Sequence, residues 1–214
     1  MSIIESNAPS AATLQLGPLS NGMMVDPEEF DAAEFEPGWR YELLNGVLIV
    51  SPSPLRQERD PNEELGRLLR NFQETPQGAV LNLTLAEETI SIGAQRRRVD
   101  RAIWCDLGRL PHDDEVPSIA VEFVSLGKPN RVRDYTIKRD EYHQAGVREY
   151  WIFDRFRKEL TVFRFQGSAA QHTVFGEGAV YASPLLPGFE LPLARLFELA
   201  DRWDTVDDAN ADKD

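Results

Sequence analysis

Three acidic residues and one lysine have the types and spacing that could support chemistry: Glu42, Asp100, Glu122 and Lys138. Glu122 lies in the apolar run IAVEFV, which is typical of a core strand, where an unpaired carboxylate is costly. Two carboxylates on adjacent strands can hold a hard cation such as Mg²⁺ through their oxygen atoms. Such an ion polarises a phosphoryl oxygen and activates water, while a lysine ammonium orients that water and balances developing negative charge. These residues are the minimum that hydrolysis of a phosphodiester bond requires.

A helix that follows the Glu122 strand is expected to bring the lysine near this carboxylate. Asp134, Lys138 and Tyr142 are spaced four residues apart, which puts them on one face of a helix. Gly146 marks the end of that helix, and the segment VREYWIFD that follows it predicts the next strand. A chain that passes from strand to helix to strand in this way can point the Lys138 side chain at Glu122.

The same residues also have a purely structural interpretation. Glu122 and Lys138 could form a buried salt bridge without any site, and Asp100 could simply end a strand. Replacing Lys138 with Met should then cost about 3–5 kcal/mol of stability, because it leaves the buried acid unpaired. Neighbouring residues have structural interpretations of their own: Asp134 as a helix cap or a partner of Arg131, Tyr142 and Trp151 as core, and Asp154 as a turn residue at the end of a strand.

Turn chemistry and hydrophobic periodicity predict the elements that position these residues. Asn45-Gly46 between apolar runs is typical of a two-residue turn, so residues 40–54 are expected to form a β-hairpin that carries Glu42. Leucines on one face predict a helix over about 62–74. The other expected elements are a helix over 26–35, strands within 79–92, 96–107, 119–124, 147–153 and 159–165, and a small helix within 184–200. This order predicts an α/β or α+β domain with a central mixed β-sheet flanked by helices.

Length and composition limit the class of protein. The 214 residues fit one domain with a sizeable core. We expect a flexible leader over 1–25, a single domain over 26–200 and an acidic disordered tail over 201–214. No apolar run approaches the length of a membrane span and no signal peptide is evident, so a cytoplasmic location without a membrane partner is expected. The single cysteine, Cys105, excludes an internal disulfide and a Cys-rich zinc site.

The net charge of −13 is concentrated near the two ends of the chain. Residues 1–39 carry −7 and residues 201–214 carry −4, so the 161 residues between them carry only −2. The central part can therefore still present a local basic surface to a nucleic acid. The densest candidates are Arg96, Arg97, Arg98 and Arg101, followed by Lys128, Arg131 and Arg133. An arginine run also suits a solvated edge strand.

Several segments occur in an order that is typical of one protein family. YELLNGVLIVSPSP, then VD, then VEFVS, then the spacing D-x-x-x-K-x-x-x-Y, then GVREYWIFD resemble the Uma-type family. Members of that family are classed as endonucleases of the restriction-endonuclease-like PD-(D/E)XK superfamily. The resemblance covers about residues 40–165. It implies a restriction-endonuclease-like core, a nucleic-acid partner, expected to be DNA, Mg²⁺ or Mn²⁺ as cofactor, and a homodimer that can cut both strands.

The resemblance also implies a role for each candidate residue. Asp100 and Glu122 take the places of the two acids of the motif, and the backbone carbonyl of Phe123 could complete the metal site with them. Lys138 is the implied counterpart of the motif lysine, moved from the strand to the helix. Glu42 is implied as an additional acid that an N-terminal element contributes.

Four features depart from the family pattern. Val124 stands where the motif usually has its lysine, Val99 stands where it has proline, and Ser125-Leu126-Gly127 replaces the common Ser-Pro-Ser. Members commonly have a histidine at the start of the helix after SPSP, where this chain has RQERDPNEEL. The implied metal ligands are retained, so a metal-dependent endonuclease is the leading hypothesis. The alternative is a catalytically inert interaction module that keeps the nuclease fold, which the acidic balance and the missing histidine favour.

Overall fold

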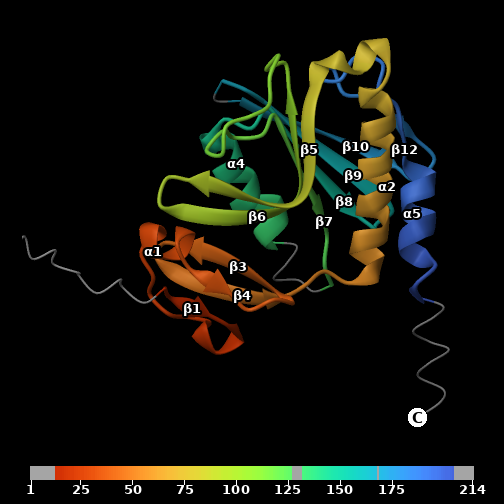
Figure 1. Ribbon diagram of the computed structural model, residues 1–214. Helices are drawn as coiled ribbons and strands as arrows, with labels where there is room; N and C mark the ends of the chain where they lie inside the picture. The colour runs from red at the N-terminus through yellow and green to blue at the C-terminus, as the bar shows by residue number, and fades with distance from the viewer. Residues whose placement is uncertain (1–12, 127–131, 168, 205–214) are drawn as a thin grey trace, which may run out of the picture.

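A mixed eight-stranded sheet forms the centre of the protein (Figure 1). The computed structural model describes residues 13–126, 132–167 and 169–204. The strands of the sheet are β3 (Trp39–Leu44), β4 (Val47–Pro52), β5 (Leu81–Ile92), β6 (Gln95–Cys105), β7 (Ile119–Phe123), β8 (Glu149–Asp154), β9 (Glu159–Gln166) and β10 (Ala169–Gly176). They lie in the order β10-β9-β8-β7-β6-β3-β4, and β5 pairs with β6. Within this sheet only β7 and β8 pair in parallel, so the expected mixed sheet is confirmed for the described residues.

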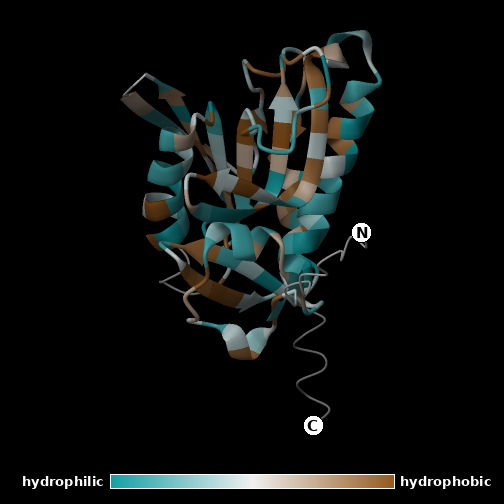
Figure 2. Ribbon diagram, turned by 60° about the vertical axis from the view of Figure 1, so that its left-hand side comes forward, coloured by the Kyte–Doolittle hydropathy of each residue, from teal (hydrophilic) through white to brown (hydrophobic). Residues whose placement is uncertain are grey.

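Helices cover both faces of this sheet, which confirms the expected layered arrangement. α2 (Arg56–Gln73) and α5 (Leu193–Asp201) lie on one face (Figure 1). The π-helical turn η3 (Arg133–Lys138) continues into α4 (Arg139–Ala145), which packs on the opposite face. Figure 2 shows hydrophobic residues along the central strands and many hydrophilic residues on the outer helices. Within the described ranges, no helix has both the length and the apolar character needed to cross a lipid bilayer.

Side-chain alternation along β7 divides the core into two layers. Val121 and Phe123 belong to the hydrophobic cluster that packs against α2 and α5. Ala120 belongs to the opposite cluster, which includes Tyr142 of α4. Because successive side chains of a strand point to opposite faces, Glu122 lies on the same face as Ala120. The strand therefore directs this carboxylate toward the helix that carries the lysine.

The predicted β-hairpin that carries Glu42 is confirmed. Leu44 of β3 pairs with Val47 of β4 across the turn. Asn45 and Gly46 have φ values of 52° and 79°, which are the positive values that a two-residue hairpin turn requires. The apolar side of the hairpin packs in a cluster with Phe30 of α1 (Pro27–Asp31).

Helix α2 begins at Arg56, so the prediction that it starts at residue 62 was wrong. Pro61 lies inside the helix, although proline lacks the backbone N–H that an interior position normally donates. The first turn is stabilised by the Glu58 carboxylate, which accepts a hydrogen bond from the Leu55 backbone N–H at 3.2 Å. Asp60 in turn accepts a hydrogen bond from the Trp203 indole at 2.8 Å. These contacts hold the first turns of α2, within which Pro61 lies.

Ordered structure also begins before residue 26, where the sequence predicts the domain boundary. β1 (Gln15–Leu16) pairs in parallel with β2 (Glu34–Phe35), and a 3₁₀ turn, η1, spans Pro18–Ser20. Leu16 is buried in the same cluster as the hairpin. The predicted helix over 26–35 is shortened to α1 because its last residues form β2. The remainder of the expected leader, residues 1–12, lies outside the described residues.

The C-terminal part contains strands that the sequence patterns do not predict. β10 extends the sheet beyond β9, and β11 (Val180–Tyr181) pairs with β12 (Leu191–Pro192). A 3₁₀ turn, η2 (Pro76–Val80), connects α2 to β5. The small helix expected before residue 200 is confirmed as α5. Residues 205–214, the larger part of the expected acidic tail, lie outside the described residues.

A close approach between α2 and β6 occurs at Gly66, where the Arg101 guanidinium fills the space that a Cβ would take. The buried Arg101 guanidinium donates to the Asn62 side chain at 2.7 Å and to Thr84 Oγ1 at 3.2 Å. A Cβ added at Gly66 would lie 2.5 Å from Arg101 Nη2. We expect Gly66→Ala to lower the free energy of unfolding by about 1–3 kcal/mol, although alanine favours a helix by about 1 kcal/mol. Urea-induced unfolding measures the difference.

The control for this substitution removes the side chain that fills the space. In an Arg101→Ala background, Gly66→Ala should raise the free energy of unfolding by up to about 1 kcal/mol, because only the helix propensity remains. A Gly66→Ala single variant as stable as the native protein would contradict the close approach.

Candidate active site

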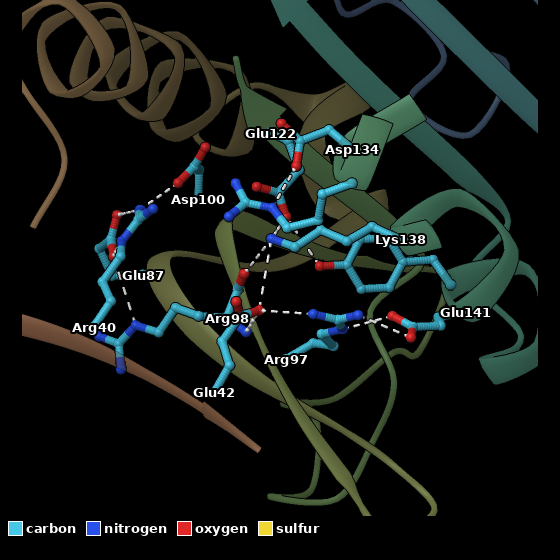
Figure 3. Close-up of polar contacts among 12 residues, drawn as sticks. Arg40, Glu42, Glu87, Arg97, Arg98, Asp100, Glu122, Asp134, Lys138 and Glu141 are labelled. Carbon is cyan, nitrogen blue, oxygen red and sulfur yellow. Dashed lines mark hydrogen bonds and ion pairs between the residues drawn. The ribbon is translucent and has the colours of Figure 1, made fainter. Parts of the chain in front are cut away.

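Glu122 and Lys138 form a buried ion pair at the centre of the candidate site (Figure 3). Lys138 Nζ donates to Glu122 Oε1 at 2.8 Å and to the backbone carbonyl of Arg98 at 2.9 Å. The Tyr142 hydroxyl donates to the same Glu122 oxygen at 2.9 Å. Glu122 and Lys138 are each only 2% exposed. The helix-borne amine therefore reaches the strand carboxylate, as the sequence predicts, and these two bonds use two of its three donors.

The local backbone explains how Lys138 and Tyr142 meet at one oxygen. Lys138 ends the π-helical turn η3 and Tyr142 lies one turn later in α4, so both share one helix face. Such π-helical turns are rare and occur frequently at functional sites. Asp134 lies inside η3 and accepts a hydrogen bond from Arg133 Nε at 3.1 Å, so it is not a helix cap. Arg131, its other predicted partner, lies outside the described residues.

Glu42 approaches the same ammonium group from β3. Its Oε1 lies 3.7 Å from Lys138 Nζ and 3.6 Å from Arg97 Nη1. The same oxygen accepts a hydrogen bond from the Arg98 backbone N–H at 3.1 Å. Burial by itself would raise the pKa of Glu42, but the charges of Lys138 and Arg97 outweigh it and lower the pKa. Glu42 is therefore a buried anion beside the Lys138–Glu122 pair.

Asp100 joins this group through the backbone of β7. Its Oδ2 accepts a hydrogen bond from the Phe123 backbone N–H at 2.6 Å, next to Glu122 in the chain. Its Oδ1 accepts a hydrogen bond from the Arg40 guanidinium, which also donates from Nε to Glu87 Oε2 at 2.8 Å (Figure 3). The Asp100 carboxylate thus already has a cation of the protein as its partner.

The buried charges control each other's protonation. Burial raises the pKa of Glu122 to about 8 against the attraction of Lys138, and repulsion by Asp100 adds to the rise. Burial would lower the pKa of Lys138, but the carboxylates of Glu122 and Glu42 outweigh it and raise the pKa. Lys138 therefore remains a cation and a hydrogen-bond donor. Burial shifts Glu122, in contrast, toward its neutral form, and further positive charge nearby would favour the carboxylate.

A cleft of about 310 Å³ lies beside these residues. The end of β4, the start of α2 and the residues after β7 line it, together with Arg40 and Arg133. Arg40 contacts Asp100, and Arg133 contacts Asp134, so both arginines connect the cleft with the buried acids. A phosphate group that entered this cleft would therefore meet two guanidinium groups.

Glu58 is a further acid in the wall of this cleft. It comes from the first turn of α2 and forms a hydrogen bond with Ser125, which follows the Glu122 strand. Burial raises the pKa of Glu58, and the charge of Asp100 contributes to the rise. The cleft thus has an acid on the α2 side as well as the two arginines.

The arginine run of β6 does not form an exposed basic surface, so that prediction was wrong. Arg96, Arg97 and Arg101 are buried. Arg96 pairs with Asp31, Arg97 pairs with Glu141 at 2.5 Å, and Arg101 bonds to α2. The sequence favours a solvated run because neighbouring arginines usually are, but acids from distant elements reach Arg96 and Arg97, and Asn62 and Thr84 bind Arg101. Arg98 keeps about one third of its side chain exposed.

The donor atoms near Asp100 and Glu122 are suited to a hard divalent cation. Carboxylate and carbonyl oxygens are the ligands that Mg²⁺ and Mn²⁺ prefer, and Mg²⁺ keeps several water ligands, so two protein carboxylates suffice. Among the described residues, no three His, Cys, Asp or Glu side chains gather closely enough to form a larger metal cluster. A cation at Asp100 would have to share that carboxylate with Arg40 or displace it.

The fold is that of a nuclease-like protein. It matches a crystal structure described as "a putative nuclease belonging to DUF820" from Anabaena variabilis ATCC 29413, with a TM-score of 0.65 and 17% sequence identity. The match covers 82% of this chain and 99% of that chain, and at this identity it shows the fold alone. No curated protein matches the chain.

The family comparison is more specific. The family described as "Uma2: Putative restriction endonuclease" matches residues 27–194. The chain belongs to this family, which confirms the resemblance drawn from its motifs. Family and fold together support a nuclease-like function.

Sequence reasoning missed three residues that contact the candidate site or its cleft. Arg40 lies two residues before Glu42 on the same strand, a spacing that could have identified it as a neighbour. Tyr142 was interpreted as core, and it is buried, but its hydroxyl also contacts Glu122. Glu58 had no recognisable signal, because its contact with Ser125 joins separate parts of the chain.

Proposed function

We propose that this protein is a metal-dependent endonuclease that hydrolyses phosphodiester bonds in DNA. The observation that carries the proposal is the buried Glu122–Lys138 pair beside Asp100, next to a cleft lined by two arginines. Burying such a group of charges costs desolvation free energy, so a protein with a purely structural role would rarely do so. Active sites commonly contain such perturbed groups.

Each side chain has a separate role in this proposal. Asp100, Glu122 and the Phe123 carbonyl would hold Mg²⁺ or Mn²⁺, which when bound supplies Lewis-acid polarisation of the phosphate and a more acidic water. Lys138 stays protonated, so its unused N–H orients the attacking water or stabilises negative charge on the phosphate. Glu42 helps to hold the ammonium in place.

The two arginines of the cleft would act on the substrate itself. Guanidinium groups match phosphate oxygens in shape and charge, so Arg40 and Arg133 are suited to bind the backbone on either side of the scissile bond. Arg40 would then exchange its contact with Asp100 for one with a phosphate. This exchange would free the carboxylate when the substrate is present.

The test compares Asp100→Asn with the native protein. Isothermal titration of Mn²⁺ into the native protein should reveal a site that the variant has lost, and supercoiled plasmid should be nicked only by the native protein in the presence of Mg²⁺ or Mn²⁺. Asp106→Asn is the matched control, because Asp106 is exposed with φ 65°, which asparagine also tolerates. Equal metal binding and equal cleavage by Asp100→Asn would refute the proposal.

An inert interaction module is the second candidate. One observation favours it: Asp100 and Glu122 already have Arg40 and Lys138 as partners, so both charges are compensated without a metal. This candidate predicts that the titration shows no site dependent on Asp100, and that no metal supports cleavage. The same experiment therefore separates the two functions.

Two further expectations belong to this proposal. A homodimer is expected from the family, because cleavage of both strands of a duplex is easiest with two sites. Light scattering coupled to size-exclusion chromatography would test it. A cytoplasmic location remains a prediction from the sequence.

A further inference from the structure

A second, smaller pocket lies near the candidate site, and half of its lining residues are aromatic. It has a volume of about 160 Å³, and its walls include Phe30, Phe35, Trp39, Tyr41 and Arg98. Trp39 is 38% exposed and Phe35 is 39% exposed, so two aromatic rings are open to solvent here. The Phe35 ring packs against Phe30 at 5.0 Å and Tyr41 at 4.8 Å between centroids, which fixes its position. The pocket is therefore a prearranged aromatic surface.

The pocket and the acid cluster share two strands. Side chains alternate along β3, so Trp39 and Tyr41 line the pocket while Arg40 and Glu42 point toward the acids. On β6, Arg98 contributes its side chain to the pocket and its backbone carbonyl to the Lys138 ammonium. The two sites face opposite sides of β3, but Arg98 and Arg40 approach the same Glu87 carboxylate, so the edge of the pocket adjoins the acid cluster.

Arg98 provides a cation with unused hydrogen-bonding capacity in this pocket. Its Nε is buried and has no hydrogen-bond partner among the described residues. The Glu87 carboxylate lies 3.5 Å from this nitrogen, beyond good hydrogen-bond geometry, and instead bonds Arg40. An anionic group in the pocket could accept a hydrogen bond from Arg98. Glu36 also lines the pocket, so its rim carries both signs of charge.

We propose that this pocket binds one unpaired nucleobase of the nucleic-acid substrate, stacked on Trp39 and Phe35, while Arg98 contacts the adjoining phosphate. Stacking on aromatic side chains is the common way in which proteins hold unpaired bases. The volume lies below that of pockets for drug-sized ligands and suits one base rather than a base pair. This inference rests on the proposed function only in taking a nucleic acid as the substrate.

The preferred substrate then contains unpaired nucleotides. A continuous duplex has its bases stacked inside and cannot present one to the pocket without the cost of extrusion. Single strands, overhangs and junctions present one freely. The pocket thus gives the enzyme a preference for nucleic-acid structure rather than for base sequence.

The experiment measures binding without metal, so that cleavage plays no part. Fluorescence anisotropy in EDTA compares a short fluorescein-labelled single strand with the same sequence as a blunt duplex. The native protein should bind the single strand more tightly. Trp39→Ala should weaken single-strand binding by about 5- to 100-fold with little effect on the duplex, and Trp39→Phe should restore part of the loss.

Arg98→Met and Phe156→Ala complete the design. Arg98→Met should lower the slope of log affinity against log salt by about 0.7, the value for one phosphate contact with a single strand. Phe156 is the matched control, because it is an aromatic residue with 39% exposure in the turn after β8, outside the pocket. Phe156→Ala should bind as the native protein does.

Several results would overturn the inference. They are no single-strand binding by the native protein, unchanged binding by Trp39→Ala and Trp39→Phe, or equal weakening for single strand and duplex. If an aromatic peptide binds in this pocket and a nucleic acid does not, the pocket serves a protein partner. That result would also overturn the inference. If Trp39→Ala behaves as expected but Asp100→Asn retains native metal binding and cleavage, the base pocket stands and the proposed catalytic site fails.

Discussion

Glu122→Gln is expected to lower metal-dependent cleavage of DNA by at least about 100-fold, the cost of removing one essential electrostatic group. Glutamine keeps the shape and an oxygen that can accept hydrogen bonds from Lys138 and Tyr142. It removes the negative charge that would help to hold the cation. Initial rates of plasmid nicking at saturating Mg²⁺ measure the effect, and circular dichroism establishes that the fold is intact.

The controls separate loss of chemistry from loss of structure. Glu198→Gln changes an exposed acid of α5 and should leave the cleavage rate unchanged. Lys138→Met tests the alternative of a purely structural ion pair, because it should cost about 3–5 kcal/mol by leaving Glu122 unpaired. If Glu122→Gln cleaves at the native rate, the carboxylate has only that structural role.

Glu149→Ala is expected to lower the free energy of unfolding by about 3–5 kcal/mol, as removal of one partner from a buried charge network does. Glu149 of β8 is only 2% exposed. Its two oxygens accept hydrogen bonds from Trp151 Nε1 at 2.9 Å and from Arg164 Nε, the Tyr181 hydroxyl and Ser183 Oγ at 2.8 Å each. The network ties the β11 segment to the central sheet. Without the carboxylate, these donors lose their common acceptor.

Urea-induced unfolding, followed by tryptophan fluorescence and circular dichroism, measures the loss. Glu159→Ala is the matched control on the neighbouring strand β9, because its partner Arg157 is half exposed and such a surface pair contributes at most about 1 kcal/mol. A loss below about 1 kcal/mol for Glu149→Ala would mean that water or other acceptors replace the carboxylate.

Glu149 and Glu122 show why burial of an acid does not by itself identify a site. Both lie on central strands and both are 2% exposed. The Glu149 carboxylate accepts hydrogen bonds from four protein groups. None of these partners lines the cleft beside the candidate site. Glu122 has a lysine and a tyrosine at one oxygen and lies next to Asp100 through the backbone of β7. The sequence singles out Glu122 because the family resemblance gives it the place of a motif acid, whereas it gives Glu149 no such place.

The sequence by itself determined the parts that depend on neighbouring residues. Period-two alternation placed Glu122 on the α4 side of β7, Asn45-Gly46 fixed the hairpin that carries Glu42, and the four-residue spacing put Lys138 and Tyr142 on one helix face. These features follow from local backbone geometry, which a short window of sequence records. The family is recognised from the order of such short segments along the chain, and the family match over residues 27–194 confirms it.

The tertiary structure alone decided which distant groups meet. Arg40 contacts Asp100 across 60 positions of the chain, and Arg96 contacts Asp31 across 65 positions, so a run of arginines became an internal network instead of a basic surface. The aromatic pocket likewise combines the segment around Phe35 with Arg98. No periodicity encodes such contacts, because they arise only when the sheet brings separate strands to one place. The charges that surround the candidate site, and hence its chemistry, therefore depend on the tertiary structure.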